Sequence, residues 1–160
     1  MRELRSILAE LPVELVSPDQ LGIDFDVEED GESYLANARK KADAGRRMTG
    51  LPTLADDSGL EVPALGGKPG VQSAYFAGPE HKGDGAALVR ALLQALGERA
   101  KSSPPAQFRC AAVLALPDGR TFEGEGVLSG TIAAEPGGTG GFGFDPIFQL
   151  SDGRRLAELS

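Results

Sequence analysis

The stretch Leu-Ala-Asp-Asp-Ser-Gly-Leu occupies residues 54–60 and continues an apolar lead-in that begins at Leu51. The lead-in predicts a buried strand, which runs into two adjacent acids, Asp56 and Asp57, and then into a Ser-Gly turn. Neighbouring residues of a strand point to opposite faces, so one acid faces a cleft while the other turns back toward the protein. Because open α/β sheets bind ligands where a strand ends in a turn, the stretch predicts a ligand site.

The two acids have two interpretations. Hard divalent cations prefer carboxylate oxygen, so an uncompensated acid pair at a strand end favours a metal site. Asp, Ser and Gly also favour turns, and these four residues by themselves indicate an ordinary polar turn.

Bulk properties restrict the function classes. The 160 residues fit a single domain, 1–160, with an ordinary apolar content of 41% and charged content of 25%. The net charge of −8 would repel a polyanion, so we expect no nucleic-acid partner. No apolar run is long enough to span a membrane and no signal peptide is evident, so we expect no membrane partner.

Cysteine and histidine usage indicates a reducing compartment and no zinc site. Cys110 is the only cysteine and lies in an apolar stretch, so we expect a small buried core residue in a cytoplasmic protein. His81 is the only histidine, and one histidine cannot build a zinc site.

Hydrophobic periodicity and turn signals predict the secondary structure. The expected helices are 4–11, 31–48 and a third between an Asp84 cap and Gly97. The expected strands are 13–16, 51–55, 107–116 and 120–128. The last two strands are expected to form a hairpin around Pro117-Asp118-Gly119. In the second helix Asn37 and Lys41 are four residues apart, so both reach one cleft, where we expect Asn37 to contact substrate.

The glycine-rich segment 137–148 places Phe142, Phe144 and Asp145 among five glycines. Such a segment suits a loop that wraps a flat ligand, with a ring to stack on a base and a carboxylate to accept from a ring N–H. A glycine-rich hairpin whose phenylalanines belong to the core fits the same residues equally well.

Taken together, the motifs of the chain resemble the inosine triphosphate pyrophosphatase family, in order and over nearly the whole length. The motifs that carry the resemblance are SYLANARKKA (33–42), TGLP (49–52), ADDSGLEV (55–62), LGG (65–67), PGV (69–71) and GFGFDPIF (141–148). The resemblance implies an α/β fold with an elongated, mixed, twisted sheet and two lobes around a cleft, usually as a homodimer. It also implies Mg²⁺-dependent hydrolysis of ITP, dITP and XTP, which are purine nucleoside triphosphates, to monophosphate and pyrophosphate.

The resemblance also implies roles for the charged residues. Asp57 matches the general base that activates water, and Asp56 beside it supports the metal site. Glu28 matches a metal ligand, with Glu29 next to it, and Lys41 matches a lysine that faces the phosphates.

The substrate contacts implied by the resemblance lie in two motifs. Ser58 matches a substrate contact, and Phe142 matches the ring that stacks on the purine. Gly143, Phe144 and Asp145 match the rest of the base pocket.

The chain departs from the family pattern at both ends. Members carry a strand and a Thr/Ser-Gly-Asn-x-x-Lys turn before the helix that starts here at Arg2, and a Ser-His-Arg segment after the stretch that matches Ala157-Glu158-Leu159. These segments supply cations, so the resemblance leads us to expect poor triphosphate turnover from residues 1–160.

Three other functions stay open at this point. A degenerate relative would bind the purine nucleotide without hydrolysing it. A phosphohydrolase that forms an aspartyl-phosphate would release orthophosphate, although Asp-x-Asp is the more usual pattern for that chemistry. A pure interaction domain would be indifferent to Asp57→Asn.

Overall fold

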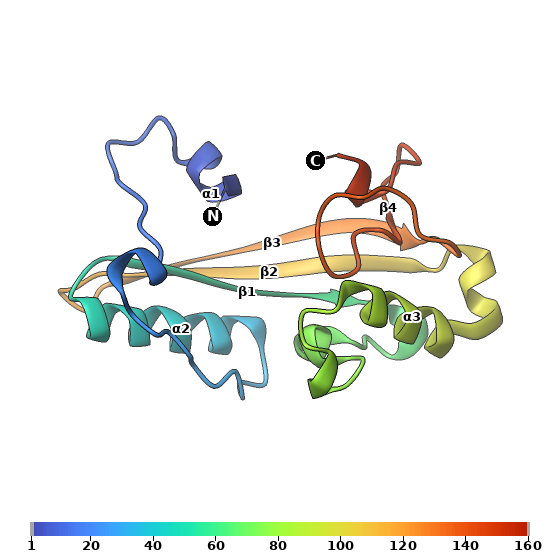
Figure 1. The fold of residues 1–160 in the computed structure, drawn as a ribbon, viewed down its shortest axis with the longest axis horizontal. Coiled ribbons are helices and arrows are strands. Elements are labelled where there is room, and N and C mark those ends of the chain that lie inside the picture. The colour runs from blue at the N-terminus through green and yellow to red at the C-terminus, as the bar shows by residue number, and fades with distance from the viewer. Residues whose placement is uncertain (1, 160) are drawn as a thin grey trace.

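The computed structural model describes residues 2–159. The elements, in chain order, are α1 (Arg2–Ile7), α2 (Tyr34–Thr49), β1 (Thr53–Glu61), α3 (Gly85–Leu96), β2 (Pro105–Ala115), β3 (Thr121–Ile132) and β4 (Phe148–Gln149), with short 3₁₀ helices between them. Three long strands run the length of the molecule, with α2 and α3 at opposite ends of them (Figure 1). The predicted α/β class with an elongated sheet is confirmed.

The four strands pair in sequence order, β1-β2-β3-β4, and every described pair is antiparallel. The register places Asp57 opposite Ala111 and Leu60 opposite Phe108. Because paired residues share a face, Asp57 and Ala111 lie on one face of the sheet and Leu60 and Phe108 on the other.

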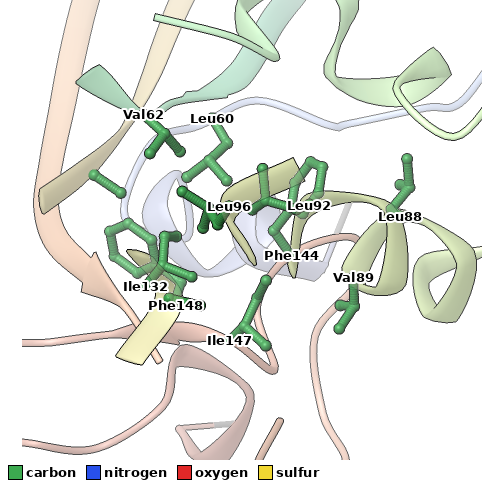
Figure 2. Packing of buried hydrophobic residues seen from close by; sticks show 12 residues of the cluster. Leu60, Val62, Leu88, Val89, Leu92, Leu96, Ile132, Phe144, Ile147 and Phe148 are labelled. Atoms are coloured by element: carbon green, nitrogen blue, oxygen red, sulfur yellow. The ribbon is translucent and has the colours of Figure 1, made fainter. Parts of the chain in front are cut away.

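The larger of two hydrophobic clusters, which we call the α3 cluster, lies at one end of the strands (Figure 2). Its largest fully buried members include Leu60, Leu92 and Phe148, and Phe108 packs its ring 4.7 Å from the Phe148 ring. Asp84 accepts a hydrogen bond from the Ala87 N–H at 2.9 Å and so caps α3 as predicted, and Gly97 ends the helix.

The smaller cluster, which we call the α2 cluster, consists of small residues. Ala38 and Ala42 of α2 pack on Val113 and Ala115 of β2. Because these side chains are short, α2 lies close to the sheet. The Arg39 guanidinium adds a two-pronged ion pair with Glu123 of β3, at 2.6 and 2.8 Å.

Two local predictions are wrong. Residues 13–16 form no strand, and Val13 and Val16 are exposed. The strand that begins at Thr53 does not end at the acid pair but continues through Ser58 and Gly59 to Glu61. Each of its nine residues has a partner in β2, so pairing overrides the turn preference of Asp-Asp-Ser-Gly.

Two other expectations are refined. The predicted hairpin 107–128 is present as β2 and β3, which extend further than expected at its open end, to Pro105 and Ile132, and stop one residue earlier at the turn. Cys110 is half-buried rather than a core residue, because it lies on the strand face that borders a cavity.

Candidate active site

Asp57 lies in the middle of β1 on the face covered by α2, and two side chains of that helix hold its carboxylate. Asn37 donates from Nδ2 to Oδ2 at 3.0 Å, and Lys41 donates from Nζ to Oδ1 at 3.3 Å. The two residues are one helical turn apart, as the sequence predicted, and the close approach of α2 brings the short Asn37 side chain within reach.

The same two side chains also hold the acidic loop that precedes α2. Asn37 accepts from the Gly31 N–H at 2.7 Å, and Lys41 donates to Glu29 Oε2 at 2.8 Å. Asn37 is only 1% exposed, so its amide is committed to these two bonds. The loop and the strand are therefore tied to each other through α2.

The electrostatics of this cluster follow from burial and from one shared lysine. Burial raises the pKa of the Asp57 carboxyl, and the bonds from Asn37 and Lys41 offset this only in part. Burial acts in the same direction on Glu29, but Lys41 outweighs it and the pKa of Glu29 falls. Burial opposes the charge of Lys41, yet its two carboxylate partners raise the pKa of the ammonium overall.

A cavity of about 620 Å³ lies against the other face of the strands. Ser58 and Cys110 line it from the sheet, Phe142 and Gly143 from the glycine-rich loop, and Leu88 from α3. Phe142 is 83% exposed, so its ring is available to a ligand.

Asp145 fixes the shape of the glycine-rich loop. Its Oδ2 accepts from the Phe142 N–H at 2.8 Å, while the Asp145 N–H donates to the Phe142 carbonyl at 3.1 Å. A Cβ at Gly141, where φ is +71°, would collide with the Asp145 carboxylate. Burial raises the pKa of the Asp145 carboxyl, although the Phe142 N–H favours the ionised form.

The structure divides the predicted site residues into two groups. Asp57, Glu29, Lys41 and Asn37 form one connected cluster. The cavity is lined by the five remaining substrate-contact candidates, Ser58, Phe142, Gly143, Phe144 and Asp145, of which Phe144 is buried in the α3 cluster.

Two predicted metal-site residues are not brought into the Asp57 cluster. Asp56 is adjacent to Asp57 in β1 and therefore lies on the opposite face. The Glu28 residue is exposed, and its backbone carbonyl accepts from Lys40 at 3.1 Å.

The cluster offers a small set of hard donors for a metal. Among residues 2–159 no three His, Cys, Asp or Glu side chains converge as a metal-binding group. Asp57 and Glu29 supply two neighbouring carboxylates, which is the number that commonly holds Mg²⁺ when phosphate oxygens and water complete its shell. The donor set fits that mode of binding and not an all-protein cage.

Two contributors to the site were missed from the sequence. The Gly31 N–H anchors Asn37, and a backbone donor carries no signal of its own in the sequence. Lys82 belongs to the loop before α3, and its charge reaches Glu29 although the two are 53 positions apart in the chain. Only the tertiary structure reveals that proximity.

None of the helices between residues 2 and 159 has the length and apolar character needed to cross a bilayer.

Comparisons with known proteins agree with this architecture. A dITP/XTP pyrophosphatase of Geobacter sulfurreducens is 45% identical over 160 residues, covering 99% of this chain and 79% of that protein. One of Streptomyces coelicolor is 47% identical over 161 residues, covering 99% and 80%.

Solved structures show the same fold. The Ham1 protein of Staphylococcus aureus superposes with a TM-score of 0.84 at 37% identity, covering all of this chain and 82% of that one. A HAM1 protein of Coxiella burnetii gives 0.86 at 36% identity, covering 99% and 81%. The model of the Ham1 family matches residues 1–160. The chain therefore belongs to the Ham1 family.

Proposed function

We propose that the chain is a nucleoside triphosphate pyrophosphatase that hydrolyses ITP, dITP and XTP to the monophosphate and pyrophosphate. The names of its relatives support this substrate class. The observation that carries the proposal is Asp57, a carboxylate held by Asn37 and Lys41 beside Glu29.

Asp57 is the proposed general base. Burial raises the pKa of its carboxyl, which strengthens the carboxylate as a proton acceptor. The proton of an attacking water passes to Asp57, the water oxygen bonds to the α-phosphorus, and the bond from that phosphorus to the bridging oxygen breaks. Pyrophosphate leaves with the electron pair of that bond. Asn37 and Lys41 keep the carboxylate oriented during this step.

Mg²⁺ is the proposed cofactor, held by Asp57 and Glu29. When bound, it would neutralise phosphate charge and supply most of the electrostatic stabilisation of the reaction. Lys41, already compensated by the two carboxylates, fixes their separation. The proposal gives Asp56 and Glu28 no direct contact with the metal.

The cavity is the proposed purine pocket. Phe142 would stack on the base, and Asp145 would hold the Phe142–Gly143 backbone against it. A backbone N–H directed at the 6-oxo group would be left without a partner by the amino group of adenine, and such a mismatch is strongly disfavoured.

We also propose a single domain that forms a homodimer in the cytoplasm. Phe122 and Leu128 are exposed on the same face of β3, with Leu128 at the rim of the cavity, and exposed apolar side chains favour self-association. Sedimentation velocity measures the oligomeric state directly, and a monomer at micromolar concentration would contradict the dimer.

Asp57→Asn tests the proposed reaction. The substitution keeps the shape but removes the proton acceptor, so we expect pyrophosphate release from ITP to fall at least about a hundredfold relative to wild type. Asp56→Asn is the matched comparison on the opposite face, and a smaller loss is expected. Equal activity of Asp57→Asn and wild type, or release of orthophosphate in place of pyrophosphate, would refute the mechanism. Equal affinities of the wild type for IMP and ITP in calorimetry would indicate a base-binding protein instead.

A further inference from the structure

Lys82 is a cation that no ion pair engages among residues 2–159. Its ammonium lies 5.0 Å from the centroid of the Tyr75 ring, and no described acid forms a salt bridge with it. The basic residues of α2 differ, since Arg39, Lys40 and Lys41 each pair with an acid. Their charges are already compensated, whereas that of Lys82 is available.

The position of Lys82 connects the two halves of the site. The next residue, Gly83, lines the 620 Å³ cavity together with Ser58 and Phe142. On the other side, Lys82 is close enough to Glu29 for the two charges to interact. Asp57 and the cavity lie on opposite faces of the sheet, and β1 is the first strand in the described order, so a nucleotide with its base in the cavity and its phosphates toward Asp57 would pass round the β1 edge and by this loop.

The electrostatic surroundings support this position. The pKa of Lys82 is raised first by the Tyr75 phenol and then by the negative charges of Glu29 and Asp26. The ammonium is therefore charged, and it lies on an exposed residue over the Tyr75 ring.

We propose that Lys82 binds the phosphate chain of the nucleotide, from the loop that borders the cavity at Gly83. The proposal rests on the proposed function, because it takes the ligand to be a nucleoside triphosphate. A triphosphate adds negative charge to a chain of net charge −8 and to a site that already holds Asp57 and Glu29. Lys82 supplies a positive charge to compensate the phosphates. The charge of Lys41 is already compensated by the two carboxylates to which it donates.

Calorimetry with inorganic pyrophosphate in MgCl₂ tests the assignment without requiring turnover. Lys82→Gln removes the charge, and we expect the dissociation constant for pyrophosphate to rise about tenfold or more, as for loss of one charge-assisted hydrogen bond. Lys82→Arg keeps the charge and should stay within about threefold of wild type. Lys101→Gln is the matched control for net charge, because Lys101 pairs with Glu98 on the exposed 3₁₀ helix 97–102.

Three results would overturn the assignment. They are pyrophosphate binding by Lys82→Gln at wild-type affinity, an equal loss in Lys101→Gln, and no pyrophosphate binding by the wild type. A lowered Tm in Lys82→Gln together with an equal loss in Lys82→Arg would instead assign Lys82 a structural role and also contradict phosphate binding. The turnover of ITP is measured separately. A wild type that binds pyrophosphate but does not hydrolyse ITP would refute the proposed reaction, and the comparison of Lys82 variants in pyrophosphate binding would still test the Lys82 assignment.

Discussion

Asn37 shows how one buried amide can orient the carboxylate proposed as the general base. The sequence suggested a substrate contact, but the side chain is 1% exposed and both of its bonds are internal. It lies between the Gly31 N–H and Asp57, so we assign it to positioning Asp57.

Asn37→Ser shortens this side chain and should break both bonds. We expect kcat for ITP to fall about tenfold to a hundredfold with little change in KM, because the orientation of the base is lost and no substrate contact is removed. Gln107→Ser is the matched control, since it removes another amide that donates to a carboxylate, at 2.7 Å to Glu61. A rise in KM with kcat unchanged would restore the substrate-contact interpretation.

Asp145→Asn separates stability from function in the glycine-rich loop. Burial raises the pKa of Asp145 above its unfolded value. The contribution of Asp145 to the free energy of unfolding is therefore fully present below the unfolded pKa, where the carboxyl is neutral. It is lost as pH rises through the folded pKa and the buried group becomes charged. Asn keeps an oxygen to accept from the Phe142 N–H and has no charge to bury. We expect Tm at pH 7 to rise by about 3 °C, and the difference from wild type to vanish near pH 3.5.

The activity of the same variant should change in the opposite direction. If Asp145 accepts a hydrogen bond from a ring N–H of the purine, Asn removes the charge from that contact and kcat/KM for ITP falls about tenfold. A Tm increase that is equal at pH 7 and pH 3.5 would show that titration of Asp145 is not its cause.

At the scale of elements, β1 depends on a glycine that lets the neighbouring segment approach. A Cβ on Gly59 would lie 2.6 Å from Ser73 Oγ and 2.9 Å from Tyr34 Cε1. Ser73 accepts from the Leu60 N–H at 2.8 Å, so this contact supports the strand next to Asp57.

Gly59→Ala should therefore be destabilising through overpacking, by about 1–3 kcal/mol. Gly124→Ala in β3 is the matched control, because a Cβ there meets nothing within 4 Å. Urea unfolding of the two variants measures the difference. Similar midpoints for both would contradict the close packing between β1 and the 3₁₀ helix 70–75.

Elements with local sequence signals were predicted correctly. The predictions failed where pairing with a strand distant in the sequence sets the bounds of an element. Helical spacing placed Asn37 and Lys41 on one side of α2, and the Asp84 cap located the start of α3. The end of β1 was misplaced because Asp-Asp-Ser-Gly has turn propensity, whereas the partner that extends the strand lies some 50 residues away in β2.

The site could be predicted only in part for the same reason. Alternation along β1 correctly indicated that Asp56 and Asp57 face different ways, but which of them meets α2 depends on the register with β2. The contribution of Lys82 depends on how the loop before α3 packs against the rest of the molecule, which no local pattern encodes.

At the scale of the whole molecule, the two hydrophobic clusters are unequal. The α3 cluster contains twelve buried residues, including several leucines and phenylalanines, whereas the α2 cluster contains four, three of them alanines. Burial of a large side chain contributes about 1.5–3 kcal/mol and alanine much less, so the α2 end has less hydrophobic stabilisation. The carboxylate cluster around Asp57 is held by Asn37 and Lys41 of α2, the helix that packs with this smaller cluster.

Hydrogen exchange should reveal this asymmetry along β1. We expect the amide of Leu60, in the α3 cluster, to exchange at least about tenfold more slowly than that of Ala55, which packs on the α2 cluster. Leu92→Ala should accelerate exchange along the whole sheet, because the α3 cluster opens only with global unfolding, and should cost about 2–5 kcal/mol. Ala42→Gly should accelerate exchange at the α2 end alone. Equal protection of Leu60 and Ala55, or acceleration by Leu92→Ala confined to α3, would show that the clusters do not open in this order.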